Sequence, residues 1–112
     1  MDWINLLSYS ELESLIHKTV DDESLTVLLF KHSTRCSISS MAKSRLDRLQ
    51  VDEKVLPVYL DLIAHRDISN AIAEKLGVEH ESPQLIVIKK GAVVSHVSHN
   101  SISKNFVEEA IA

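Results

Sequence analysis

The sequence contains a single cysteine, Cys36, and only two glycines and two prolines. One cysteine cannot form an internal disulfide, which excludes a disulfide-stabilised secreted scaffold and favours a reducing, cytoplasmic location. No apolar run approaches the roughly 18 residues of a membrane-spanning helix, and no basic segment followed by an apolar stretch opens the chain. We therefore expect neither a membrane partner nor a secretion signal.

Composition and charge narrow the class of protein further. With 112 residues, of which 45% are apolar and 25% charged, the sequence predicts one globular domain over residues 1–112. A formal net charge of −4 opposes binding to phosphates, so we expect no nucleic-acid partner. Basic residues are concentrated around the cysteine: Lys31, Arg35, Lys43, Arg45 and Arg48. Most of them fit a solvated helix face, whereas Arg35 could also hold a thiolate or an anionic thiol substrate.

Apolar spacing predicts the first three elements of regular structure. A helix is expected over Ser10–His17, with Ser10 as its capping residue and Glu13 completing a capping box. Thr26–Phe30 is a continuous apolar and β-branched run, typical of a strand covered on both faces. A second helix from Cys36 would bury one apolar stripe: Ile38, Met41, Ala42, Leu46 and Leu49.

The rest of the chain continues the alternation of strands and helices. The expected elements are a strand over Val55–Leu62, a helix over Ile68–Leu76 stopped by Gly77, a hairpin of Gln84–Ile88 and Val93–Val97, a helix to Ala112 capped by Ser101 or Ser103, and an edge strand over Trp3–Leu6. Such alternation implies parallel pairing through right-handed crossovers, with an antiparallel edge from the hairpin. We predict an α/β fold, a three-layer α/β/α sandwich around a mixed sheet of four or five strands.

Cys36 stands where the first core strand gives way to a helix. Free backbone N–H groups at a helix N-terminus and the helix macrodipole favour the thiolate, which is the nucleophile in disulfide exchange. Ser39 occupies the position of the second cysteine in a C-x-x-C pair, so the protein can hold only one disulfide at a time. This pattern indicates monothiol chemistry. A buried structural thiol is the alternative, although the polar flanking residues oppose it.

Three segments resemble the thioredoxin superfamily in the right order. They are the strand, turn and helix around Cys36-x-x-Ser39, the Ser82-Pro83-Gln84 segment, which is similar to the cis-proline loop, and the Lys90-Gly91 turn. Within that superfamily, residues 30–40 resemble the signature of the YtxJ-type bacilliredoxins, small cytoplasmic proteins linked to the low-molecular-weight thiol bacillithiol. The usual family residue after the cysteine is proline. Ser37 stands there instead and leaves an N–H available to the thiolate, which should tune reactivity.

The resemblance implies a site made from two segments. Cys36 would be the catalytic residue, and the substrate-binding residues would be Thr34, Arg35, Ser37, Ile38, Ser39, Ser82, Pro83 and Gln84. The Ser39 hydroxyl would hydrogen-bond the sulfur, or serve only as a first-turn helix residue. Pro83, expected in the cis form near the sulfur, would shape an edge to which a substrate chain pairs as an added strand; a trans strand-start proline is the alternative. The two segments are expected to meet because parallel crossovers return each strand to the same edge of the sheet.

Phe30 and the histidines bear on proton transfer and on metal binding. Phe30 occupies the position of the buried acidic proton relay of thioredoxins, a loss that agrees with the missing resolving cysteine. His32 is either a solvated turn residue or a cation or base assisting Cys36. His96 and His99 lie three residues apart on a strand and would point to opposite faces. We therefore expect no metal site, and no metal or organic cofactor is implied.

These features together favour a monothiol disulfide oxidoreductase. It would remove a small thiol such as bacillithiol, its cosubstrate, from mixed disulfides of S-thiolated client proteins, and we expect it to act as a monomer. Two alternatives stay open: a redox-inactive thioredoxin-fold module that binds partner proteins through the Pro83 groove, and a stress sensor in which Cys36 is modified. Turnover at Cys36 distinguishes the three.

Overall fold

A computed structural model describes the whole chain, residues 1–112. Its elements in chain order are β1 (Ile4–Asn5), α1 (Tyr9–Asp21), β2 (Thr26–His32), α2 (Ser37–Asp47), β3 (Val55–Asp61), α3 (Arg66–Leu76), β4 (Gln84–Lys89), β5 (Ala92–Ser98), the 3-10 helix η1 (His99–Ser101) and α4 (Lys104–Ile111). None of the helices combines the length and the apolarity needed to cross a membrane.

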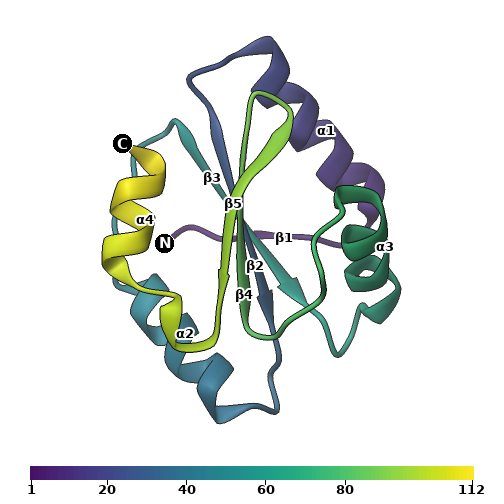
Figure 1. The fold of residues 1–112 in the computed structure, drawn as a ribbon, viewed down its shortest axis with the longest axis vertical. Helices are drawn as coiled ribbons and strands as arrows, with labels where there is room; N and C mark the ends of the chain where they lie inside the picture. Colours follow the sequence, from purple (N-terminus) through teal and green to yellow (C-terminus); the bar gives the residue numbers. More distant parts are fainter.

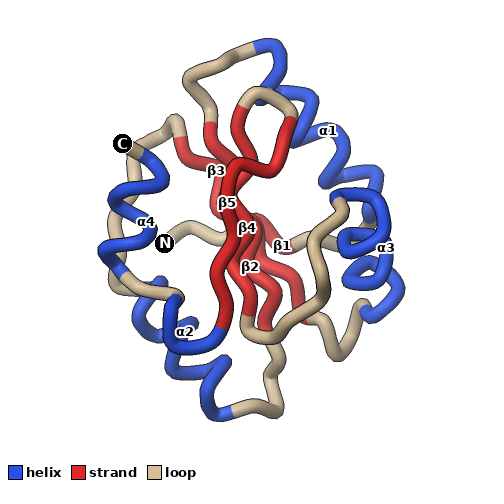
Figure 2. The backbone as a smooth tube through the Cα atoms, in the orientation of Figure 1, coloured by secondary structure: helices blue, strands red, loops and turns tan.

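The five strands form one mixed sheet in the order β1–β3–β2–β4–β5. Figures 1 and 2 show α1 and α3 on one side of this sheet and α2 and α4 on the other. The predicted three-layer α/β/α sandwich is therefore confirmed. The edge strand expected from Trp3–Leu6 exists as the two residues of β1, which pair in parallel with Val58 and Tyr59 of β3.

The central strand β2 separates two hydrophobic cores, and all seven of its residues are buried. Val27 and Leu29 belong to the core shared with α1 and α3, whereas Leu28 and Phe30 belong to the core shared with α2 and α4. A strand covered on both faces needs apolar residues at every position, which explains the unbroken apolar run. β2 also extends two residues beyond the predicted strand.

One part of the predicted topology is wrong. β3 runs parallel to β2, as expected, but β4 runs antiparallel to β2, so α3 is not a parallel crossover. The reversal places Gln84, the first residue of β4, opposite Lys31 near the end of β2. The Ser82–Gln84 segment and the cysteine turn thus lie at the same end of the sheet because β4 is antiparallel; a parallel β4 would have begun at the opposite end.

Two serine side chains cap helices, and one of them differs from the prediction. Ser8, not Ser10, caps α1, and its Oγ accepts a hydrogen bond from the Glu11 N–H at 3.3 Å. The helix begins earlier than expected because Tyr9 packs against the core that the sheet shares with α1 and α3. Ser103 caps α4, as one of the two predicted candidates, by accepting from the Phe106 N–H at 3.1 Å.

The hairpin turn between β4 and β5 consists of Lys90 and Gly91, because the strands take in Lys89 and Ala92, which the sequence had placed in the turn. Both residues have positive φ angles, 52° and 78°, which is the requirement of a two-residue type I′ turn. The Gly91 N–H donates to Thr19 Oγ1 of α1 at 2.9 Å, so the turn is held against the helix. The predicted stop of α3 is confirmed, since Gly77 follows the helix with a φ of 67°.

Candidate active site

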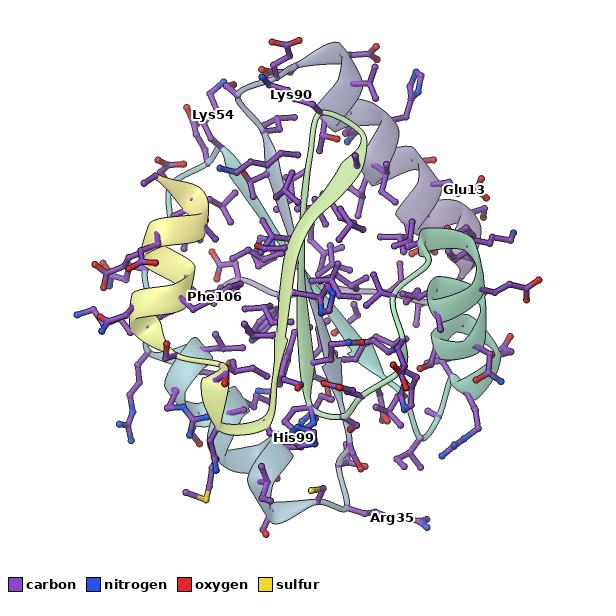
Figure 3. The ribbon with its side chains drawn as sticks, viewed as in Figure 1. Glu13, Arg35, Lys54, Lys90, His99 and Phe106 are labelled. Carbon is purple, nitrogen blue, oxygen red and sulfur yellow. The ribbon has the colours of Figure 1, made fainter.

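Cys36 is the N-cap residue of α2, at the end of the sheet where β2 finishes. Its side chain is half-buried and makes no capping hydrogen bond, so the sulfur is available for reaction. The Cys36 backbone is held on both sides: its N–H donates to the Ser33 carbonyl at 3.2 Å, and its carbonyl accepts from the Ser40 N–H at 3.0 Å. Figure 3 shows Arg35 at this end of the molecule, with its side chain projecting into solvent.

Ser39 faces inward rather than toward the thiol. Its side chain is fully buried, and its Oγ lies 2.7 Å from His32 Nδ1 and accepts from the Ser33 N–H at 2.9 Å. The hydroxyl makes no hydrogen bond with the sulfur, so that prediction is wrong. Ser39 instead joins α2 to the end of β2 and fixes the turn that carries Cys36, which assigns it a positioning role and not substrate contact.

The buried face of α2 also differs from the predicted stripe. Ser39, Ala42 and Leu46 are buried, whereas Ile38 and Met41 are 41% and 61% exposed. The helix is rotated in this way because Ser39 must reach His32 and the Ser33 N–H. As a result Ile38, together with the exposed Thr34, Arg35 and Ser37, surrounds Cys36 with side chains that an incoming molecule can touch.

His32 is not a solvated turn residue, which corrects one of the two predictions for it. It is the last residue of β2, is 5% exposed and stacks on Phe30, with ring centroids 5.6 Å apart. Burial and, after it, the positive charge of Lys43 lower the pKa of His32 below its usual value. The neutral imidazole is therefore the dominant form at pH 7, which suits a hydrogen-bonded neighbour of Ser39 better than a cation beside the thiolate.

An aromatic cluster surrounds Phe30, the residue that the sequence aligns with the buried acidic residue of thioredoxins. Phe30 is fully buried and stacks on Trp3, with centroids 5.7 Å apart, while Tyr59 lies 5.7 Å from His32 and 6.1 Å from Trp3. Trp3 Nε1 donates to Asp47 Oδ1 of α2 at 2.6 Å and so ties the cluster to that helix. The site thus rests on a packed aromatic base with no carboxyl group at the Phe30 position.

The second predicted segment approaches the site from β4. The Ser82–Pro83 peptide bond is cis, as expected from the sequence. The Pro83 carbonyl accepts a hydrogen bond from the His99 N–H at 3.0 Å, which joins the segment to η1. Gln84 is fully buried and its Nε2 donates to the Glu79 carbonyl at 2.9 Å, so its side chain cannot touch a substrate as predicted.

No group of three or more His, Cys, Asp or Glu side chains is arranged to hold a metal ion. His99 lies beyond β5 in η1, so the two histidines of the His96-x-x-His99 pair are not on one strand. Figure 3 shows His99 at the same end of the molecule as Arg35. His99 is exposed, and the hydrogen bond from its N–H to the Pro83 carbonyl holds it beside the Ser82–Gln84 segment.

Sequence reasoning missed the burial of Lys31. This residue follows the apolar run of β2 and is 0% exposed, although lysine is almost never fully buried. Desolvation lowers the pKa of Lys31 to about 8. The signal that could have revealed it is the sheet itself, because a central strand that continues past Phe30 must bury whatever residue comes next.

Comparisons with known proteins agree with this geometry. Residues 4–107 match the family described as monothiol bacilliredoxin BrxC. A solved structure described as a candidate oxidoreductase with a thioredoxin fold is 29% identical, with a TM-score of 0.83, and the match covers 98% of this chain and 94% of that one. Thioredoxin from Fasciola hepatica is 18% identical, with a TM-score of 0.72, and the match covers 96% of this chain and 94% of that one. Thioredoxin from Trypanosoma brucei brucei is 13% identical, with a TM-score of 0.73, and the match covers 98% of this chain and 88% of that one.

The two thioredoxins show the fold alone, whereas the family match spans nearly the whole chain and includes Cys36. A thiol redox function follows from the family and from the single available cysteine at a helix N-terminus. The chain belongs to the monothiol bacilliredoxin family and has the thioredoxin fold.

Proposed function

We propose that the protein removes a low-molecular-weight thiol, such as bacillithiol, from mixed disulfides with client proteins, and that Cys36 carries the reaction. The observation that supports this most directly is the placement of the only cysteine at the N-cap of α2, half-exposed and free of hydrogen bonds at its sulfur. The bacilliredoxin family supports the same class of chemistry.

The first step of the proposed reaction is a single thiol–disulfide exchange. The Cys36 thiolate attacks the sulfur of the small thiol in the client mixed disulfide. A Cys36–small-thiol disulfide forms, the client–small-thiol disulfide breaks, and the client cysteine leaves as a thiolate. The unpaired N–H groups in the first turn of α2 favour negative charge at the sulfur.

The second step clears the cysteine. Since the chain has no second cysteine, an external thiol must attack the small-thiol sulfur of the Cys36 disulfide, so that Cys36 leaves as the thiolate. When a second molecule of the small thiol attacks as cosubstrate, the symmetric disulfide of the small thiol forms. When a partner reductase attacks with its own thiol, a reductase–small-thiol mixed disulfide forms, and in both cases the Cys36 thiolate is released. The same helix terminus favours Cys36 as attacking group and as leaving group. The proposed reaction uses no resident metal or organic cofactor.

The side chains around Cys36 give the proposed substrates their contacts. Arg35 is exposed beside the cysteine and could hold an anionic group of the small thiol, while Thr34, Ser37 and Ile38 line the approach. Ser82 would offer its backbone N–H and carbonyl to the client chain, in the manner of an added strand, and Pro83 would shape that edge. A client and a small thiol would then occupy different sides of one sulfur.

The test measures release of the small thiol from a model client protein that carries it in a mixed disulfide. We expect the wild-type protein to release the small thiol and Cys36→Ser to release none, while both variants have the same unfolding transition because the side chain is small and makes no hydrogen bond. Arg35→Gln is the companion variant, expected to weaken the reaction with anionic small thiols more than with neutral ones.

Retained release by Cys36→Ser would contradict the proposal and favour a partner-binding module. A protein that accepts the small thiol once but never turns over would instead indicate a sensor of thiol modification.

A further inference from the structure

Lys31 is the least expected residue of the central strand. It lies in β2 with no exposed surface, and its Nζ has no hydrogen-bond partner. In the sheet it stands between Leu60 of β3 and Gln84 of β4, on the side of the core shared with α1 and α3. An unpaired ammonium in such a place opposes folding, since charge loses its hydration there.

Besides Arg45 Nη2, two further buried polar side-chain atoms lack hydrogen-bond partners, and both belong to the segment around Pro83. They are Gln84 Oε1 and Ser82 Oγ. Gln84 is directly opposite Lys31 in the β2–β4 register, and side chains in such pairs have their Cβ atoms about 5 Å apart. A donor with three hydrogens therefore lies across from a residue whose acceptor is also unpaired, and the unpaired Ser82 hydroxyl is two residues further along that chain. Groups of this kind are normally satisfied by each other or by an internal water molecule.

The neighbouring loop is linked to the same residues. Gln84 Nε2 donates to the Glu79 carbonyl at 2.9 Å, and His80 Nδ1 lies 3.4 Å from Ser69 Oγ of α3. Burial and the charge of Lys31 lower the pKa of His80, so the lysine acts electrostatically on this loop. Gln84 thus connects Lys31 on one side with residues 79–83 on the other.

We propose that Lys31 is a positioning residue for the Ser82–Gln84 segment, acting on Gln84 Oε1 and Ser82 Oγ through one buried water. In this arrangement the ammonium holds Gln84 in place, Gln84 holds the Glu79–Pro83 loop, and the loop presents a fixed backbone edge to the client chain. The inference rests on the proposed function, because it assigns the segment to client recognition. It also explains why a lysine occupies a position that methionine would fill without a desolvation penalty.

The first experiment separates client recognition from the chemistry of the sulfur. Lys31→Met keeps the length of the side chain and removes its charge. We expect this variant to release a small thiol from a client protein about tenfold more slowly, the factor that corresponds to the ~1.4 kcal/mol scale of one buried hydrogen bond. Alkylation of Cys36 by iodoacetamide should keep its wild-type rate, because that reagent does not use the Ser82–Gln84 edge.

The matched control is Lys89→Met, which removes a half-buried lysine at the far end of β4 and should leave both rates unchanged. Wild-type client rates in Lys31→Met would overturn the inference, and so would an equal loss in both rates, which would indicate a general structural defect. Failure of the proposed function itself would look different, since the wild-type protein would then release no small thiol.

A second measurement needs no client. Gln84→Glu places a carboxylate opposite Lys31 but removes the donor to the Glu79 carbonyl, so we expect a melting temperature lower than that of the wild type, by much less than the same change causes in the Lys31→Met background. In the Lys31→Met background the same change leaves a buried carboxylate unpaired, so the melting temperature should fall by more than the sum of the two single effects. Additive effects would show that the two side chains do not interact and would overturn the inference.

Discussion

At the scale of single residues, the site depends on polar side chains that are buried in the core. Ser39 Oγ accepts from the Ser33 N–H and contacts His32 Nδ1, and these bonds fix the last residue of β2 and the start of the cysteine turn relative to α2. Lys31 and His32 extend the central strand with two polar residues, one toward each core. None of these burials follows from hydrophobic periodicity, because a serine, a lysine and a histidine after an apolar strand are typical of a surface turn.

Ser39→Ala should destabilise the protein without abolishing its chemistry. The substitution leaves the buried Ser33 N–H and His32 Nδ1 without their partner, and we expect a loss of about 1–3 kcal/mol in the free energy of unfolding, measured by urea denaturation. Ser37→Ala, at an exposed position two residues earlier, should change it by less than about 0.5 kcal/mol. Small-thiol release by folded Ser39→Ala should persist, since the hydroxyl does not bond the sulfur. Complete loss of release in a folded Ser39→Ala protein would return Ser39 to the catalytic site.

Lys31 should make the stability of the protein depend on pH above neutrality. Its pKa is about 8 in the folded protein and 10.5 without burial, so between these values the unfolded chain binds more protons than the folded one. The contribution of Lys31 to the free energy of unfolding therefore rises with pH across this range. It is lowest below about pH 8, where the folded protein carries the buried charge. Tyr9 and Tyr59, whose pKa values burial raises, oppose this trend near pH 10 and above.

The comparison with Lys31→Met isolates the lysine, because both proteins contain the same tyrosines. We expect the difference in unfolding free energy, wild type minus Lys31→Met, to increase as the pH rises from about 8 toward 10.5, the two pKa values of Lys31. A difference that is constant over this range would show that Lys31 is not desolvated.

At the scale of elements, the order and identity of the helices and strands could be predicted from the sequence, whereas the direction of β4 could not. Apolar runs and turn residues are local signals, so they predict a strand over Gln84–Ile88 and a turn after it, one residue short of the observed β4. Strand direction depends on which neighbour β4 pairs with, and this is decided by long-range packing against β2. For the same reason the rotation of α2 escaped prediction, because Ser39 turns inward to meet partners on another element.

Two glycines distinguish a conformational requirement from a packing requirement. Gly77 and Gly91 both have positive φ, but a Cβ at Gly77 would meet nothing within 4 Å, whereas a Cβ at Gly91 would lie 2.5 Å from Val20 Cγ2. We expect Gly77→Ala to cost about 1 kcal/mol of stability, from the left-handed backbone alone. Gly91→Ala should cost clearly more, because the turn must also move away from α1. Thermal unfolding of the pair measures this, and equal losses would mean that α1 yields to the turn without cost.

At the scale of the whole molecule, the fold gathers the candidate site residues at one end of the sheet. Cys36, Arg35 and His99 lie at this end, and Figure 3 shows Lys90 and Lys54 at the opposite end. β2 brings the cysteine turn there, and the antiparallel β4 brings Ser82 and Pro83 there. The thioredoxin fold could be predicted because its three characteristic segments are present in the sequence, and the solved structure with a TM-score of 0.83 agrees with it.

Intact mass spectrometry tests most directly whether Cys36 takes a small thiol from a client protein and holds it. The wild-type protein is mixed with a client that carries bacillithiol in a mixed disulfide, and separately with the same client carrying glutathione. We predict that the protein gains the mass of one bacillithiol on Cys36 while the client loses it. Added reductant should reverse this gain, and glutathione should transfer more slowly than bacillithiol. An unchanged protein mass beside a client that keeps its small thiol would contradict the account.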